Sequence, residues 1–352
     1  NSTSYYFSVA SGNIGEFFDE MYLNTPWEQH YENLDGRTIL DRLASVKYFV
    51  VKNNRYQYVP YGYYWLEGSA EKNGKIYEAF GSEEALPLGY TYDSFIPGEE
   101  YEKMTVTEKQ QALLQGIVLE DSSLPEITPE FNDQEIPYEI RKGKGCSVKD
   151  GKIKVTKEGA KLELLFNGLE NSETYLIAEG LDYDGEKKWN KMTRYEQNQL
   201  LHEDSHWRYW KESQKASITV GGQFPEKTIR IFTDKYNAYS GKHNFLCNTG
   251  YEKAAKQSIT LTFEKPGVYT FDKLKIVCQP MERITKQTEK LNQEVLTDIR
   301  MDTNRITGNI SLSEPKGLLI SVPYSKGFRA YVDGKETELK KANTMYMALE
   351  LP

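Results

Sequence analysis

The stretch Gly317–Lys335, GLLISVPYSKGFRAYVDGK, decides the fold expected near the C-terminal end of this chain. Gly317–Val322 is a leucine-rich and β-branched run of strand length. Phe328–Val332 alternates apolar and polar residues with the period of two that marks a half-buried strand. Asp333-Gly334 then supplies the positive φ angles of a tight hairpin turn. The stretch therefore predicts a twisted antiparallel unit with one face in a core.

Residues from about 130 to 280 show the same strand signal many times. Short runs of strand length are separated by turn residues, a pattern typical of a β-sandwich. The last two runs, around a Pro-Gly turn, are similar to the end of a jelly roll of the carbohydrate-binding-module type, an analogy of fold only. The runs are Ile153–Thr156, Lys161–Phe166, Thr174–Gly180, Ala216–Val220, Thr228–Phe232, Ser258–Phe263 and Lys273–Cys278.

Helices are predicted on both sides of this central region. Thr107–Gly116 reads as a helix with a capping box formed by Thr107 and Gln110. Met281–Ile299 carries one apolar stripe and is predicted as a helix packed on the body. The expected fold class is α+β, mainly β, in three parts. They are a mixed α+β domain at 1–125, an antiparallel β-sandwich at 130–280, and a helix plus a small β unit at 281–352 that packs back on the body.

Three segments together resemble the YfhO family of bacterial membrane proteins. LLISVPYSKGFRAYVDGKE (Leu318–Glu336) resembles the family's C-terminal signature. DGRTILDRLASVKYFVVKN (Asp35–Asn53) resembles its short helix running into an "SVKYF"-type strand, and ALPLGYTYDSF (Ala85–Phe95) resembles a third segment. The segments occur in the family's order and span the chain, while the middle, about 130–280, carries no such match.

The resemblance implies a polytopic glycosyltransferase that uses a polyprenyl-phosphate sugar at the outer face of the cell membrane. Such proteins are linked to glycosylation of lipoteichoic acid or other cell-wall polymers in Gram-positive bacteria. This chain would be an extracytoplasmic domain, proximal to the membrane at 1–125, that recognises the acceptor or positions the donor. The catalytic carboxylate is expected in a loop outside this chain, so no catalytic residue and no cofactor are assigned. In the matching stretches, Arg37 and Lys47 could face a lipid-linked phosphate, because cations suit phosphate recognition. Capping and surface solvation are the alternative.

Composition agrees with a domain that lies outside the bilayer. The 352 residues carry a net charge of -8, which disfavours nucleic acid as a partner. The mean hydropathy is -0.67, and no run approaches the roughly 18–20 apolar residues of a membrane span. Because the first residue is Asn, we expect a piece of a longer protein whose flanking helices hold it at the membrane.

Cysteine and histidine patterns offer two further hypotheses. Cys146, Cys247 and Cys278 lack metal-ligand spacing, and a Cys247–Cys278 disulfide is left open. His202-Glu203-Asp204-Ser205-His206 matches the H-E-x-x-H pattern of zinc hydrolases. Asp204 and Ser205 are poor residues for a helix interior, however, and the flanks lack a buried apolar face. A zinc hydrolase is therefore a remote alternative, and no metal is assigned.

An aromatic run from Tyr183 to Trp210 is the main candidate for binding carbohydrate. Sugars pack their C–H faces on flat rings, while neighbouring polar groups take the hydroxyls. We expect at least two of its three tryptophans to be partly exposed in one shallow groove. The alternatives are an insertion that packs on itself, and a non-enzymatic wall-binding module in place of a transferase. The candidate binding residues here are Trp189, Arg194, Tyr195, Trp207 and Trp210.

Overall fold

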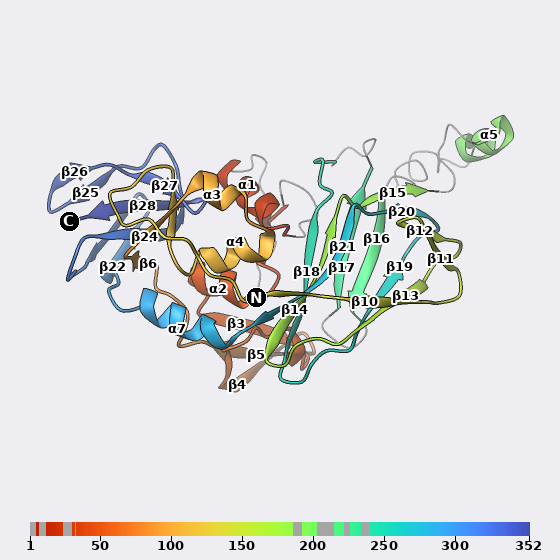
Figure 1. Ribbon diagram of the computed structural model, residues 1–352, viewed down its shortest axis with the longest axis horizontal. Coiled ribbons are helices and arrows are strands. Elements are labelled where there is room, and N and C mark those ends of the chain that lie inside the picture. The colour runs from red at the N-terminus through yellow and green to blue at the C-terminus, as the bar shows by residue number, and fades with distance from the viewer. Residues whose placement is uncertain are drawn as a thin grey trace.

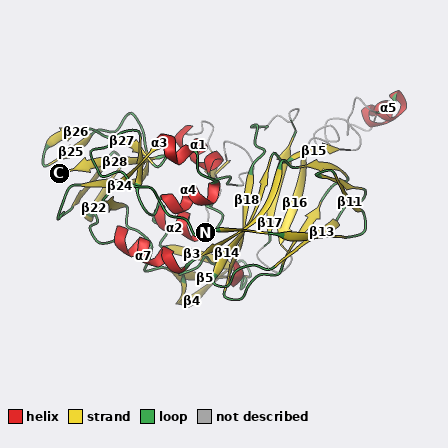
Figure 2. Ribbon diagram, in the orientation of Figure 1, coloured by secondary structure: helices red, strands yellow, loops and turns green. Residues whose placement is uncertain are grey.

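The computed structural model describes residues 5–6, 12–23, 30–31, 33–185, 192–202, 215–221, 226–233 and 239–352. Strands far outnumber helices among these residues, and nearly all strand pairs are antiparallel. Figure 1 shows an elongated molecule with the helices gathered in one half and a β-sandwich in the other. Figure 2 shows how strongly strands dominate the sandwich half. The predicted class, α+β and mainly β, is confirmed.

Two sheets face each other in the sandwich and share one core. The core receives Leu162 and Leu164 from one sheet and Leu176 and Ile276 from the other. The first sheet runs in the order β10 (Tyr138–Lys142), β13 (Ala160–Phe166), β19 (Ser258–Phe263), β16 (Lys215–Gly221), β17 (Lys227–Phe232). The second runs β18 (Phe245–Glu252), β14 (Ser172–Glu179), β21 (Lys273–Pro280), β9 (Gln134–Ile136).

A smaller sheet adjoins the sandwich and adds Tyr183 and Tyr269 to its core. Its order is β11 (Cys146–Lys149), β12 (Lys152–Val155), β20 (Gly267–Thr270), β15 (Asp182–Gly185). All three cysteines are free thiols. Cys247 and Cys278 lie on the two strands that flank β14, opposite Leu176 and Thr174. Two strand spacings are about 9.5 Å, which is beyond the reach of a disulfide.

The helical half is built from both ends of the chain around one hydrophobic core. Strand β6 (Gly89–Tyr92) pairs with β24 (Lys316–Pro323), which also pairs with β28 (Tyr346–Leu351), and β27 (Lys340–Ala342) completes the sheet. Beside it, β7 (Phe95–Pro97) and β8 (Ile117–Leu119) form a parallel pair. The helices are α1 (Gly12–Glu20), α2 (Thr38–Leu43), α3 (Gly98–Glu102), α4 (Val106–Ala112) and α7 (Glu282–Leu291), with the 3-10 turn η1 (Tyr56–Tyr58).

Several short strands project from this half. One sheet has the order β3 (Tyr48–Lys52), β5 (Lys75–Gly81), β4 (Tyr64–Lys72). Three two-stranded units are β1 (Tyr5–Tyr6) with β2 (His30–Tyr31), β22 (Thr297–Asp302) with β23 (Arg305–Asn309), and β25 (Ala330–Val332) with β26 (Lys335–Thr337). Helix α5 (Arg194–His202) lies beyond the sandwich at the right of Figure 1. No helix in the described ranges is long and apolar enough to cross a membrane.

Three local predictions can be compared with these elements. The Asp333-Gly334 turn is present, with φ angles of 50° and 79°. Met281–Ile299 is wrong as one helix, because α7 ends at Leu291 and Ile299 lies in β22, which pairs with β23. The capping box of α4 is formed by Thr105 and Glu108. Thr107 instead donates a hydrogen bond to Asp133 (2.7 Å).

Candidate functional site

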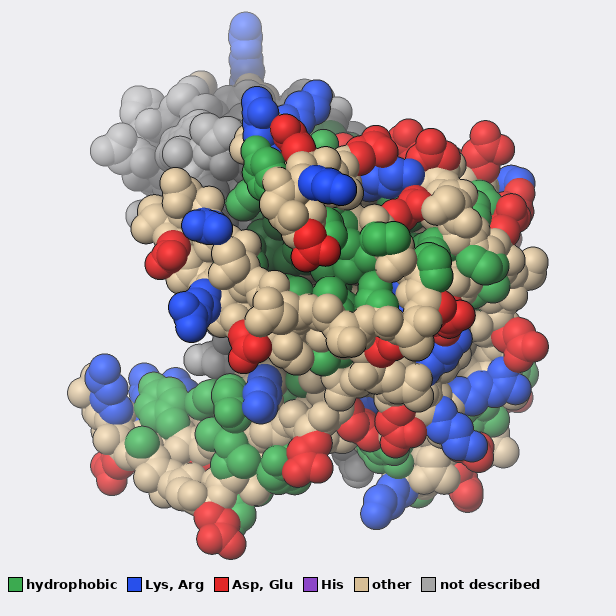
Figure 3. Space-filling model, turned by 90° about the vertical axis from the view of Figure 1, so that its left-hand side faces the viewer, with side chains coloured by type: hydrophobic (Ala, Val, Ile, Leu, Met, Phe, Trp, Pro, Cys, Tyr) green, Lys and Arg blue, Asp and Glu red, His purple; other side chains and the backbone are tan. Residues whose placement is uncertain are grey.

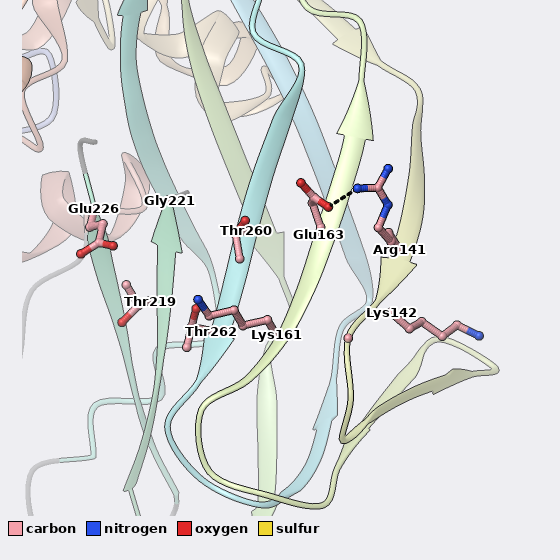
Figure 4. A pocket seen from close by; sticks show the side chains of 10 residues that line it. Arg141, Lys142, Lys161, Glu163, Thr219, Gly221, Glu226, Thr260 and Thr262 are labelled. Carbon is pink, nitrogen blue, oxygen red and sulfur yellow. Dashed lines mark hydrogen bonds and ion pairs between the residues drawn. The ribbon is translucent and has the colours of Figure 1, made fainter. Parts of the chain in front are cut away.

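The outward face of the five-stranded sheet is the candidate site. Strands β13 and β19 alternate between buried positions and half-buried or exposed positions. The apolar residues of each strand enter the sandwich core, so the polar residues line up on the opposite face. This face is hollowed into an open groove of about 290 Å³, shown from close by in Figure 4.

Two adjacent rows of cross-strand neighbours form the floor of the groove. Residues directly opposite in neighbouring strands have their side chains about 5 Å apart on one face, so each row is a continuous strip of polar groups. The first row is Lys161, Thr262 and Thr219. The second row is Arg141, Glu163, Thr260 and Gly221. Lys142, Gly143 and Glu226 complete the lining.

Among the described residues, the groove combines an unpaired cation, Lys161, with free hydroxyls. Arg141 Nη1 contacts Glu163 Oε2 at 3.0 Å, the dashed line in Figure 4. Lys142 and Lys161 form no ion pair within the described ranges. The hydroxyls of the three threonines likewise have no side-chain partner there, and they can bind a ligand. Lys161 has no acidic partner there and lies beside these hydroxyls, so the lining suits an anionic ligand that also carries hydroxyl groups.

Close backbone packing fixes one edge of the groove. The Gly143 N–H donates to the Lys161 carbonyl oxygen at 3.0 Å. A Cβ atom at Gly143 would lie only 2.5 Å from that oxygen, so a side chain there would push the strand ends apart. Glycine therefore allows the chain after β10 to close against β13. Lys142, which lies opposite the core residue Leu162, directs its side chain away from the groove (Figure 4).

The aromatic run does not meet this groove in the part that the structure describes. Trp189, Trp207 and Trp210 lie outside the described residues, so their expected exposure stays a prediction. Arg194 and Tyr195 begin α5, both exposed, and Tyr195 is 72% exposed. Tyr183 is a core residue instead: its ring lies 4.9 Å from that of Tyr269, and it is 4% exposed.

The two candidate phosphate-facing cations have opposite surroundings. Arg37 is fully buried, and its Nη2 donates to the carbonyl oxygen of Met21. Burial lowers the pKa of its guanidinium group. In this position Arg37 has no surface to offer a lipid phosphate. Lys47 is exposed, with its Nζ 5.8 Å from the centre of the Tyr48 ring, so its role stays a prediction.

The H-E-x-x-H pattern is only partly described. His202 is the last residue of α5, and residues 203–206 lie outside the described ranges. Within those ranges, no group of three or more His, Cys, Asp or Glu residues could hold a metal ion.

Sequence reasoning missed every residue of the groove. The available signal was the repeated threonine in the polar positions of β16 and β19, where an ordinary solvated face more often carries long charged side chains. That signal could not show that the two strands are neighbours, because their register depends on pairing between distant segments.

Comparison with known proteins now gives the relatives of this chain. A family model described as "Bacterial membrane protein YfhO" matches residues 1–352. The curated protein described as "Uncharacterized protein YfhO" from Bacillus subtilis (strain 168) is 20% identical over 359 residues. That match covers 99% of this chain but 37% of the relative, so the chain spans little more than a third of the relative's length.

Proposed function

Because the chain belongs to the YfhO family of bacterial membrane proteins, we propose that it is the acceptor-binding part of a polytopic glycosyltransferase. The longer protein would transfer sugar from a polyprenyl-phosphate donor to lipoteichoic acid or another wall polymer. The transfer would occur at the extracytoplasmic face of the cell membrane. Since the chain corresponds to 37% of its relative, the chemistry is assigned to the remainder, and this chain binds without catalysing.

The observation that supports acceptor binding is that several polar side chains in the sheet groove have no protein partner in the part of the chain that the structure describes and can contact a ligand. Lys161 can donate charge-assisted hydrogen bonds to a phosphate oxygen. Thr219, Thr260 and Thr262 can exchange hydrogen bonds with glycerol or sugar hydroxyls. A groove that is open along the sheet admits an extended polymer of repeating phosphate and polyol units. The wall polymer is therefore proposed to lie across the strands.

Strand order supports a jelly-roll interpretation of the sandwich. When β9, β13, β14, β16, β17, β18, β19 and β21 are numbered one to eight, the sheets run 1-8-3-6 and 2-7-4-5. Two nested Greek keys produce this order, and β10 adds an edge strand. The same architecture favours a second candidate function, a non-enzymatic module that binds neutral carbohydrate, although fold alone does not fix the ligand.

The test is a calorimetric titration of the chain with a synthetic polyglycerol phosphate and, separately, with a neutral glycan. We expect a dissociation constant on the order of a millimolar for the anionic polymer. In an open polar groove, the cost of desolvating polar groups offsets most of the free energy gained from the new contacts. The Lys161→Gln variant should weaken binding about tenfold, because it removes the charge-assisted contact. Thr262→Val, which keeps the β-branched shape, should weaken it by a smaller factor.

Lys335→Gln, an exposed lysine on β26, is the matched control and should bind like the parent chain. Binding by Lys161→Gln equal to that of the parent chain would overturn the assignment of the groove. Preference for the neutral glycan would favour the carbohydrate-binding module. Transfer of sugar from a polyprenyl-phosphate donor by the purified chain would contradict the proposed division of roles.

A further inference from the structure

A second surface lies on the β3–β5–β4 sheet, outside the sandwich. Strand register places six side chains on one face of this sheet, here called the Tyr–Lys face: Tyr48, Tyr64, Tyr77, Lys52, Lys72 and Lys75. Tyr48 and Tyr64 both lie opposite Gly81, Lys52 lies opposite Tyr77, and Lys72 opposite Lys75. Directly opposed residues share a face, and so do residues two apart along a strand.

This face is open in the structure. Tyr48 is 57% exposed and Tyr64 is 49% exposed. Val50 and Ala79, which lie opposite each other between the tyrosines and the lysines, are only half-buried. In Figure 3, the lobe at the lower left carries hydrophobic side chains close to basic ones, with acidic side chains at its edges. Exposed apolar surface of this kind marks a contact site.

The two faces of the sheet differ in the charge of their side chains. Glu71 and Glu78 lie opposite Ile76 and Ser69, in register positions that direct both carboxylates to the other face. Within the described ranges the three lysines of the Tyr–Lys face form no ion pair. The adjacent Lys75 ammonium group lowers the pKa of Lys52, which shows how closely these cations are crowded. A chain of net charge -8 thus has one sheet face with three cations and no opposing acid.

We propose that the Tyr–Lys face rests on the surface of an anionic phospholipid bilayer. Tyrosine suits the headgroup layer because its ring is apolar and its hydroxyl is polar. Lysine stems can lie along that layer while their ammonium groups contact lipid phosphates. The matching family is described as a bacterial membrane protein, and the proposal depends on that membership for a bilayer close to the chain. Lys47, exposed beside Tyr48, adds a fourth cation next to the face.

The experiment is flotation of the 352-residue chain with vesicles of phosphatidylglycerol and phosphatidylcholine, compared with phosphatidylcholine alone. Binding is expected only to the anionic vesicles and should fall as salt rises. The Lys52→Gln/Lys72→Gln/Lys75→Gln variant should bind roughly 100-fold more weakly, since each basic residue near an anionic surface contributes about fivefold. Tyr48→Ser/Tyr64→Ser should also release the chain from anionic vesicles.

The matched control is Tyr331→Ser/Lys335→Gln on the β25–β26 hairpin, where Tyr331 is 58% exposed. It should bind vesicles like the parent chain, and unchanged melting temperatures would show that all variants fold. Absence of binding to anionic vesicles would overturn the proposal, as would equal loss in the control. Binding of soluble polyglycerol phosphate through the three lysines, with no vesicle binding, would overturn it in favour of a polymer site.

Discussion

At the scale of single residues, the feature to explain is the ionisable pair buried on α2. All six residues of this helix are buried, including Asp41 and Arg42. Arg42 forms an ion pair with Glu84, and burial lowers the pKa of Arg42 to about 10. Burial and the nearby Glu173 charge raise the pKa of Asp41 to about 8. The folded chain therefore holds a proton on Asp41 that the unfolded chain releases above about pH 4.

This difference predicts how stability depends on pH. Between about pH 4 and pH 8 the unfolded state binds fewer protons at this position, so the free energy of unfolding falls as pH rises. Asp41→Asn removes the ionisation and should make the chain more stable than the parent at pH 8 by at least about 1 kcal/mol. The two should be nearly equal at pH 4. Urea unfolding at several pH values measures both curves.

Glu102→Gln, which changes an exposed acid on α3, is the control and should leave the pH dependence unchanged. Parallel curves for Asp41→Asn and the parent chain would contradict the protonated state of Asp41.

At the scale of elements, α4 shows how a cap fixes where a helix begins. The Thr105 hydroxyl accepts from the Glu108 N–H at 3.3 Å, and Glu108 Oε2 accepts from the Thr105 N–H at 2.8 Å. The helix packs Val106, Ala112 and two glutamines inward, so its first turn positions buried groups.

Loss of the cap should therefore lower the stability of the whole chain. Thr105→Ala is expected to reduce the free energy of unfolding by about 1 kcal/mol, because a first-turn N–H loses its acceptor. Thr105→Ser keeps the hydroxyl and should restore most of that loss, as measured by thermal or urea unfolding. If alanine and serine were equally stable, the cap would have no energetic role.

At the scale of the whole molecule, a buried polar junction joins the helical half to the sandwich. Asp35 accepts hydrogen bonds from Lys227 Nζ at 2.8 Å and from the Asn248 N–H at 2.7 Å. Nearby, Glu173 of β14 accepts from the Thr38 hydroxyl at 2.6 Å. Asp35 and Thr38 belong to one half, whereas the other three residues belong to sandwich strands. The junction therefore couples the two halves and fixes the groove relative to the Tyr–Lys face.

Removal of the Asp35 carboxylate should weaken that coupling. Asp35→Ala leaves the Asn248 N–H without its acceptor and leaves Lys227 Nζ only the backbone carbonyl oxygen of residue 35. It also places alanine at a φ of 61°. The expected cost is about 2–4 kcal/mol, and calorimetry should show a broader or divided unfolding transition. Asp35→Asn accepts a positive φ and keeps an acceptor, so it should lose less. A single unchanged transition for Asp35→Ala would show that the halves are coupled elsewhere.

The sequence by itself determined most strands of the sandwich, although not β9, β10 or β18, and the turn that ends the opening stretch. Both depend on local causes: the alternation in Ser258–Phe263 divides two faces, and Asp333-Gly334 accepts positive φ angles wherever it lies. The sequence also indicated the family: three segments resembled it, and the family model matches residues 1–352.

Only the tertiary structure decided which polar residues share a surface. Arg141, Lys161 and Thr219 meet in the groove because β10, β13, β19 and β16 are neighbours in a sheet of non-consecutive strands. Arg37 reads as a surface cation in the sequence, yet it is enclosed by segments remote from it along the chain. Helix α7 ends early because the residues after it gain strand partners in β23. In each case the deciding contacts join distant parts of the chain, and local periodicity contains no information about them.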